Sequence, residues 1–380
     1  MSDTTSGQTS NGQQRPLQRL SLLGQSVWID YLSRGMIRGG HLQKLIDEDA
    51  VVGATSNPTI FQKAFAEGDA YDEEMAQLAA GRSASEIFWA LAQRDVGEAC
   101  DVFRPVWERT ERRDGYVSIE VDPGLAYEGL ASYREAISLH EQIDRPNLLV
   151  KIPATKPGLA AIEDVIAKGR SINVTLIFSL QRYAEVAESY IRGIERLIAE
   201  GGDPGGVASV ASFFVSRIDT EADRRLDEIG GHDDLKGRLA VANARLAYQH
   251  YKECFSGERW EYLASKGAQT QRVLWASTST KNPAYEDTIY VEDLIGAQTV
   301  NTMPEETILA YQDHGEPEPR LESSLEDARS LFRKLADAGV DYDDVTLTLE
   351  REGVEKFSAS FGELVESLGA KLAALSPASA

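Results

Sequence analysis

Cysteine and histidine are scarce in this sequence, with two cysteines and five histidines among 380 residues. Cys100 and Cys254 show no CxxC or other metal-ligand spacing, and no two histidines have the HxH or HExxH spacing of a metal site. We therefore expect both cysteines to be reduced residues that serve in packing, as in a cytoplasmic protein. We also expect chemistry that needs no metal ion.

Positive charge and long apolar runs are lacking as well. Lys and Arg number 39 against 61 Asp and Glu, and the formal net charge is -22 at pH 7. Such a charge repels nucleic acid and anionic membranes, so we expect neither as a partner. No run of about 18 apolar residues occurs and no apolar signal core begins the chain, which predicts a soluble cytoplasmic protein. No GxGxxG or GxxxxGKS/T motif follows a predicted strand, so no nucleotide cofactor is expected.

The length leaves the number of domains open. Residues 1–16 are mostly Ser, Thr, Gly, Gln and Asn, too polar to form a core, and predict a disordered tail. An α/β barrel uses about 200 to over 400 residues as one unit. No linker rich in Pro, Gly and Ser separates two cores, so residues 17–375 are predicted to form one domain.

The rest of the chain alternates short β-like runs with amphipathic helical stretches, which is typical of a parallel α/β fold. Eight strands predict a (β/α)8 TIM barrel with extra helices, here between residues 220 and 267, and a helical C-terminal extension at about 321–375. Helices are expected at 84–93 and 95–112, and Gly339, Gly353 and Gly362 are possible breaks in the extension. The predicted strands are Ser26–Tyr31, Val51–Thr55, Tyr116–Asp122, Leu148–Ala154, Ser171–Phe178, Val207–Phe214, Arg272–Ser277 and Gln298–Met303.

One of these strands carries a lysine, Lys151, in the otherwise apolar run Leu148–Thr155. Lysine is rarely buried without a partner, and burial of an ammonium group lowers its pKa, which favours the free amine needed to attack a carbonyl group. The alternative is a lysine at a strand end that extends to water. The side-chain pattern of the other strands decides between a buried, reactive lysine and a lysine that extends to water.

Side-chain alternation places polar residues on one face of several strands. Asp30, Ser118, Glu120, Asn173, Thr175, Ser212 and Phe214 share the parity that we assign to the barrel axis, together with Lys151. In barrel enzymes the chemistry lies at the C-terminal ends of the strands. Each residue alone could be a satisfied polar group of the core. Together, a buried amine and two acids indicate Schiff-base chemistry on a carbonyl compound.

Several stretches also resemble the transaldolases, in order and spacing from about Gly24 to Pro304. The matching stretches are Gly53–Phe61 (GATSNPTIF), Ser118–Asp122 (SIEVD), Lys151–Thr155 (KIPAT) followed by Gly158 and Leu159, Asn173–Ser179 (NVTLIFS) and Ser212–Arg217 (SFFVSR). The resemblance, to the longer bacterial type, implies a barrel enzyme of the pentose phosphate pathway. Such an enzyme moves a dihydroxyacetone unit from sedoheptulose 7-phosphate to glyceraldehyde 3-phosphate, giving erythrose 4-phosphate and fructose 6-phosphate.

The resemblance also implies a role for each matched residue. Lys151 forms the imine with the ketose, and Asp30 is the acid and base at the cleaved carbon–carbon bond. Glu120 shuttles protons through a water molecule that Thr175 helps to hold. Asn57 and Asn173 are implied to bind the hydroxyl groups of the donor, and Ser212 and Arg217 the phosphate. Ser118 and Phe214 are further candidates for substrate binding.

Two departures from the family pattern limit the comparison. Shorter members carry Arg after the seventh strand, where this chain has a longer loop, and Lys281 is our candidate for that phosphate contact. Ser216 replaces a common Gly. Glu120 and Phe214 stand where the aldolase branch tends to have Gln and Tyr, which favours transfer. The alternatives are a fructose 6-phosphate aldolase and a non-catalytic sugar-phosphate-binding barrel. We expect the protein to be a monomer or a homodimer.

Overall fold

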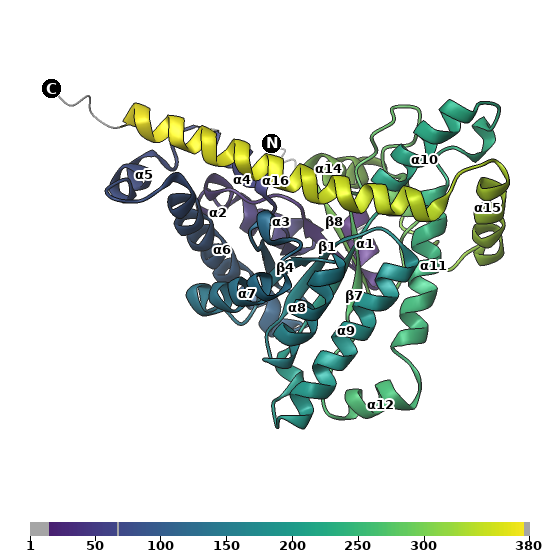
Figure 1. Cartoon of the computed structure of the whole chain (residues 1–380), viewed down its shortest axis with the longest axis horizontal. Helices are drawn as coiled ribbons and strands as arrows, with labels where there is room; N and C mark the ends of the chain where they lie inside the picture. The colour runs from purple at the N-terminus through teal and green to yellow at the C-terminus, as the bar shows by residue number, and fades with distance from the viewer. Residues whose placement is uncertain (1–14, 67, 376–380) are drawn as a thin grey trace, which may run out of the picture.

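The computed structural model describes residues 15–66 and 68–375, and its centre is a closed barrel of eight parallel strands (Figure 1). This confirms the predicted fold class, and each strand ends within two residues of its predicted bounds. The strands are β1 (Gln25–Ile29), β2 (Val51–Ala54), β3 (Tyr116–Glu120), β4 (Leu148–Pro153), β5 (Ile172–Ile177), β6 (Ser209–Phe214), β7 (Arg272–Ala276) and β8 (Thr299–Met303). The ring closes where β1 pairs with β8, with Gln25 opposite Thr299.

Helices surround the barrel. They are α1 (Pro16–Leu22), α2 (Arg34–Arg38), α3 (His41–Glu48), α4 (Pro58–Ala66), α5 (Asp72–Leu78), α6 (Ala84–Arg109), α7 (Gly129–Ile143), α8 (Lys156–Ala167), α9 (Leu180–Ala199), α10 (Ser216–Ile229), α11 (Leu239–Cys254), α12 (Gly257–Ser265), α13 (Ile289–Glu292), α14 (Glu305–His314), α15 (Leu325–Asp337) and α16 (Tyr342–Leu375). Three short 3-10 helices complete the set: η1 (Pro123–Leu125), η2 (Pro204–Gly206) and η3 (Asp233–Leu235). The extra helices expected between residues 220 and 267 are present. They are α11, α12 and the part of α10 that follows residue 219.

Three details of the prediction were wrong. The expected helices 84–93 and 95–112 form the single helix α6, because no glycine or proline stands at residues 93–95 to interrupt it; Asp95 lies inside the helix and pairs with Arg34 at 2.8 Å. Gly353 and Gly362 lie inside α16, and of the three glycines only Gly339 lies at a break. The predicted tail extends two residues too far, since Arg15 caps α1 and Pro16 begins it; residues 1–14 lie outside the described part of the chain.

The lower part of the barrel interior is filled by side chains of the predicted inward parity. The Trp28 ring occupies the space that a side chain at residue 53 would need, since a Cβ on Gly53 would lie 2.5 Å from that ring. Below it, Arg272 pairs with Asp114 at 2.9 Å and donates to Ser26 Oγ at 2.8 Å. The bottom of the barrel is therefore a packed polar layer that supports the strands, and the open end is at their C-termini.

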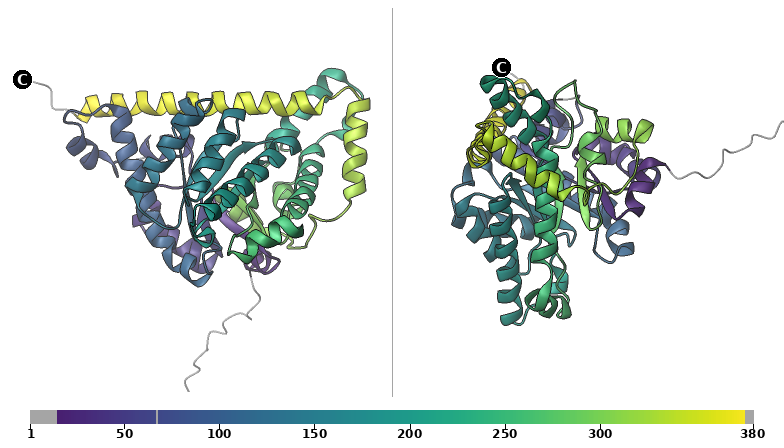
Figure 2. Two further views of the ribbon diagram at one scale, coloured as in Figure 1. Left: turned by 60° about the horizontal axis from the view of Figure 1, so that its bottom comes forward. Right: turned by 90° about the vertical axis from the view of Figure 1, so that its right-hand side faces the viewer.

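The helix α16 crosses this open end. It contacts α4 and η1, which follow the C-terminal ends of β2 and β3, and it also contacts β5 and α10. Figure 2 shows it running along one edge of the molecule, over the barrel. Ion pairs fix both ends of the helix, between Asp344 and Arg225 at 2.7 Å and between Lys371 and Asp72 at 2.6 Å. The C-terminal extension thus forms part of the mouth of the barrel.

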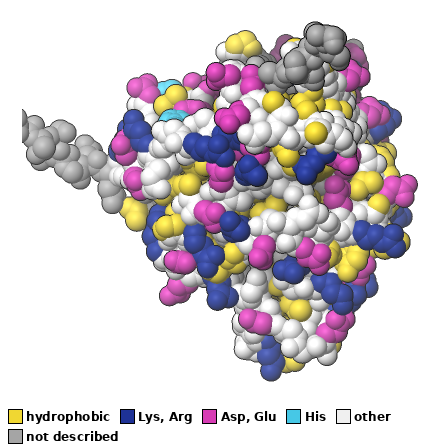
Figure 3. Space-filling view, turned by 90° about the vertical axis from the view of Figure 1, so that its left-hand side faces the viewer, with side chains coloured by type: hydrophobic (Ala, Val, Ile, Leu, Met, Phe, Trp, Pro, Cys, Tyr) yellow, Lys and Arg dark blue, Asp and Glu magenta, His cyan; other side chains and the backbone are white. Residues whose placement is uncertain are grey.

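The surface is charged and mixed. On the face drawn in Figure 3, basic and acidic side chains of the described residues are interspersed, and apolar side chains occur between them in small groups. None of the helices in the described ranges has a stretch both long and apolar enough to cross a membrane.

Candidate active site

A cavity of about 580 Å³ opens at the C-terminal ends of the strands. It brings together eight of the eleven residues that were predicted from the sequence. These are Asp30, Asn57, Lys151, Thr175, Ser212, Phe214, Arg217 and Lys281. The other three, Ser118, Glu120 and Asn173, are buried next to the cavity. Glu120 contacts Lys151, Asn173 contacts Ser212, and Ser118 contacts Asn173.

Lys151 is the residue around which the site is arranged. It is 5% exposed on β4, and its Nζ lies 3.3 Å from Glu120 Oε1 and donates to the carbonyl of Ser56 at 3.0 Å. Glu120 is its register partner on β3, so two neighbouring strands hold the ammonium and the carboxylate side by side. The lysine extending to water, which was the alternative, is therefore excluded.

Glu120 is an acid with little solvation. Burial raises its pKa above the usual value, and the charge of Lys151 opposes that rise. Apart from the ion pair with Lys151, neither carboxylate oxygen accepts a hydrogen bond from the described residues, and the Thr175 hydroxyl is unpaired among them. Buried polar atoms normally have partners. Both groups are thus available to hydrogen-bond a substrate or a bound water molecule.

Asp30 follows β1 and lies in the same cavity. It accepts a hydrogen bond of 2.6 Å from Thr55, whose hydroxyl also lies 2.7 Å from that of Thr302. Burial raises the pKa of Asp30, while the Thr55 hydrogen bond and the charge of Lys151 lower it. A carboxyl group whose pKa is shifted towards neutrality is suited to take up and return a proton.

A chain of hydrogen bonds crosses the barrel interior beneath the cavity. Ser212 donates to Asn173 Oδ1 at 2.7 Å, and Asn173 Nδ2 donates to Ser118 at 3.1 Å. Because β4 separates β3 from β5, the second bond shows that both side chains point inward, as their parity predicted. Asn173 is also the register partner of Lys151. The chain fixes the amide of Asn173 next to the lysine.

Two cations lie at the rim of the cavity. Arg217 is the second residue of α10, and its guanidinium carbon lies 5.0 Å from the centre of the Phe214 ring. Burial lowers the pKa of Arg217, and it forms no ion pair within the described ranges. Lys281 is exposed on the loop after β7 and donates to Ser279 at 2.6 Å. Arg217 and Lys281 could together bind an anionic group of a ligand.

Asn57 has a structural contact that the sequence did not predict. Its Oδ1 accepts a hydrogen bond of 3.0 Å from the backbone N–H of Ile60, so it caps the first turn of α4. The Nδ2 group is left for a ligand in the cavity.

Sequence reasoning gave no role to several residues of the cavity, and three of them matter most. Thr55 was inside a quoted motif but was given no role, although it holds Asp30. Lys63 on α4 and Phe357 on α16 also line the cavity. The position of Lys63 in the sequence does not indicate whether its side chain points towards the cavity. Phe357 could not be placed because it depends on where α16 packs.

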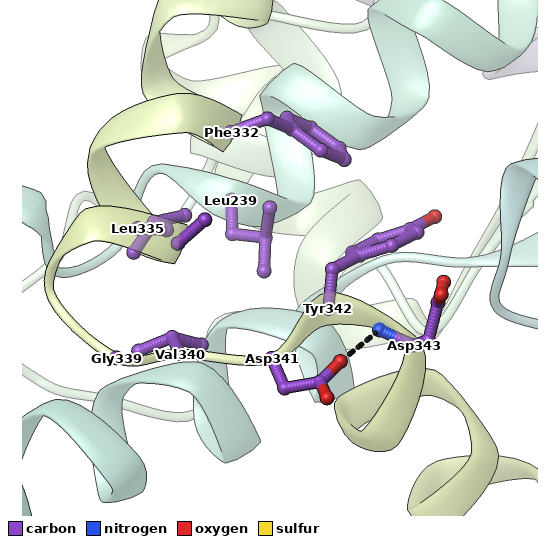
Figure 4. Close-up of a pocket in the computed structure, with 9 residues that line it drawn as sticks. Leu239, Phe332, Leu335, Gly339, Val340, Asp341, Tyr342 and Asp343 are labelled. Carbon is purple, nitrogen blue, oxygen red and sulfur yellow. Dashed lines mark hydrogen bonds between the residues drawn. The ribbon is translucent and has the colours of Figure 1, made fainter.

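A second cavity, of about 490 Å³, lies between α11, α15 and the start of α16 (Figure 4). Leu239, Phe332 and Leu335 extend towards it from three sides, and the only charged side chains in its lining are Asp341 and Asp343. Asp341 accepts a hydrogen bond of 3.0 Å from the backbone of Asp343. Its acidic and apolar lining does not suit a phosphate. No group of three or more His, Cys, Asp and Glu side chains in the described ranges is placed to hold a metal ion.

A (β/α)8 barrel with a buried lysine beside two acids at its open end is typical of enzymes that form a Schiff base with a carbonyl substrate. The family model described as transaldolase/fructose-6-phosphate aldolase matches residues 27–368. The chain belongs to this family.

Curated relatives match over nearly the whole chain. A transaldolase of Mycobacterium tuberculosis (strain ATCC 25618 / H37Rv) is 50% identical over 361 residues, which cover 94% of this chain and 97% of the relative. Transaldolases of Frankia alni, with 49% identity over 94% of this chain and 97% of the relative, and Acidothermus cellulolyticus, with 51% over 93% and 96%, are similar to the same extent.

Proposed function

We propose that this protein is a transaldolase that moves a dihydroxyacetone unit from a ketose phosphate to an aldose phosphate, as in the reaction stated above, within the pentose phosphate pathway of the cytoplasm. The observation that carries the proposal is the Lys151 Nζ, buried 3.3 Å from Glu120 in a cavity that also contains Asp30. Family membership and the transaldolases that match over nearly the whole chain support the same function.

The first half-reaction forms the imine. The free amine of Lys151 attacks the ketose carbonyl carbon, a carbon–nitrogen bond forms, and the carbonyl oxygen leaves as water. Glu120 returns and removes the protons through a water molecule that the Thr175 hydroxyl helps to hold. Its pKa, raised by burial, suits this exchange. Asn57, Asn173 and Ser118 orient the hydroxyl groups of the donor.

The second step breaks a carbon–carbon bond. The Asp30 carboxylate takes the proton of the hydroxyl group on the carbon beyond the bond, and the bonding electrons move into the imine. The aldose phosphate leaves, and an enamine remains on Lys151. The enamine then attacks the carbonyl carbon of an acceptor aldehyde, which is the reverse of the cleavage, and Asp30 protonates the aldehyde oxygen. The phosphate of donor and acceptor binds Arg217, which meets two oxygens with its fork, together with Ser212 and Lys281.

Borohydride trapping tests the proposal. Reduction in the presence of fructose 6-phosphate should attach the dihydroxyacetone unit to Lys151, located by peptide mass spectrometry. The Lys151→Ala variant is the matched control and should acquire no label. Labelling of another lysine would refute the assignment of Lys151, and no label in the native protein would leave a sugar-phosphate-binding barrel.

The alternative aldolase activity is separated by product analysis. A transaldolase cleaves fructose 6-phosphate rapidly only when erythrose 4-phosphate is present as acceptor. An aldolase releases free dihydroxyacetone or its equivalent at the same rate without acceptor. Phe214 and Glu120 favour the first outcome. Equal rates with and without acceptor would show that the protein is an aldolase and not a transaldolase.

A further inference from the structure

The inner side of α16 presents an apolar wall to the Lys151–Glu120 pair. Val354, Phe357 and Phe361 follow one another at helical spacing, and Phe357 is 7% exposed. The centre of its ring lies 6.0 Å from Lys151 Nζ, and the ring lines the cavity. This is an aromatic contact to the amine that comes from outside the barrel strands.

The wall also covers Glu120 from behind. Two gaps adjoin this carboxylate, one lined by Val354 and Phe357 and the other by Phe361 and Phe88. Their volumes are about 0 and about 10 Å³, and a cavity needs at least about 10–15 Å³ to hold one water molecule. The packing behind Glu120 therefore leaves almost no room for water, whereas the main cavity, where the substrate also binds, lies open to solvent.

The position of the wall is fixed by the fold. A Cβ on Gly353 would lie 2.9 Å from Leu176 Cδ2, so the glycine permits a close approach of α16 to the end of β5. Phe357 lies one turn further along the helix. Nearby, Ser360 accepts a hydrogen bond of 3.0 Å from Thr59, and Glu350 pairs with Arg182 at 3.4 Å. These contacts hold the ring above the lysine.

We propose that Phe357 is a specificity-determining residue, which keeps water from the enamine on Lys151 so that the enamine reacts with an aldehyde acceptor. This inference rests on the proposed transaldolase function. The reaction to be suppressed begins when the enamine carbon takes a proton from Asp30. Water then adds to the imine carbon, the carbon–nitrogen bond breaks, and free dihydroxyacetone leaves with the amine of Lys151 restored. Excluding water from a reactive intermediate is a known use of a closed site.

The test compares two rates in the full-length protein. One is the release of free dihydroxyacetone from fructose 6-phosphate without acceptor, and the other is transfer to erythrose 4-phosphate. In Phe357→Ala the ratio of release to transfer should rise on the order of tenfold, because water gains access to the intermediate before an acceptor reacts, while Lys151, Glu120 and Asp30 are unchanged. Phe357→Leu retains an apolar wall and should keep the ratio within about twofold of the native value.

Leu349→Ala is the matched control. Leu349 is 6% exposed on the same helix and does not line the cavity, so its truncation loosens the packing of α16 without opening the wall. An unchanged ratio in Phe357→Ala would overturn the inference, and so would an equal rise in Leu349→Ala. Both leave borohydride labelling of Lys151 in the native protein intact, whereas loss of that label would refute the proposed function itself.

Discussion

The buried acid Asp219 should make the stability of this protein depend on pH. It lies on α10, two residues after Arg217, and is 1% exposed. Its carboxyl group accepts hydrogen bonds from the Ala240 N–H at 2.7 Å and from the Tyr290 hydroxyl at 2.8 Å. Burial outweighs both and raises the pKa of Asp219 from 3.8 to about 7. Around neutral pH the side chain of Asp219 therefore loses its proton and becomes a buried carboxylate anion.

The sign and size of the effect follow from the two pKa values. Since the pKa is raised in the folded state, its contribution is fully present below the unfolded value of 3.8 and is lost as the pH rises through about 7. The free energy of unfolding falls by about 1.4 kcal/mol per pH unit between these values. From pH 5 to pH 8 the loss from this one residue is about 3 kcal/mol.

Urea denaturation at pH 5, 6, 7 and 8 measures this loss. Asp219→Asn cannot ionise, so its free energy of unfolding should fall less from pH 5 to pH 8 than that of the native protein, by about 3 kcal/mol. Glu135, whose pKa burial also raises to about 7, contributes equally to both proteins and cancels. Asp47→Asn is the control, because Asp47 also accepts a side-chain hydrogen bond, from Gln43, but is exposed to solvent. The reasoning fails if Asp219→Asn and the native protein show the same pH dependence.

Three further predictions concern the ends of the barrel. Asp30→Ala should still give a borohydride-trapped imine with fructose 6-phosphate but cleave it about 10²–10⁴-fold more slowly, and loss of the imine would reassign the residue. Lys281→Ala should raise the KM for fructose 6-phosphate, and Lys281→Arg should restore it; an unchanged KM in the Ala variant would remove Lys281 from the phosphate site. Arg272→Leu leaves Asp114 buried without its partner at the barrel bottom, and urea denaturation should show a loss of about 3–5 kcal/mol with an unchanged KM. A loss below about 1 kcal/mol would show that the pair contributes little.

The barrel and its inward polar face could be predicted because both depend on local patterns. Branched apolar runs with a period of two mark each strand, and neighbouring parallel strands bring equivalent positions level with each other. Glu120, Lys151 and Asn173 are therefore found side by side in the structure, at the register positions that their parity implied. Roles such as proton transfer came from the family resemblance and from the chemistry of the groups, and they remain predictions.

The placement of α16 could not be predicted from local pattern. Gly353 read as a break because glycine weakens an isolated helix, yet here it permits the close contact with Leu176 that holds the helix over the mouth. Phe357 therefore meets Lys151 through packing between segments far apart in the chain. Lys63 is a similar case, because the sequence predicts an exposed lysine on a helix but not which part of the protein that side of the helix faces.

The position of α16 also has a consequence for the order in which the protein is made. The strands from Gln25 to Met303 close the ring by their own hydrogen bonds, so all eight precede α16 during synthesis. We expect a nascent chain to display the amine of Lys151 in an open barrel until Phe357 leaves the ribosome and packs. During that interval the amine is exposed to any aldehyde in the cell. We expect that loss of the final helix by premature termination or proteolysis would leave the amine of Lys151 without the cover of Phe357.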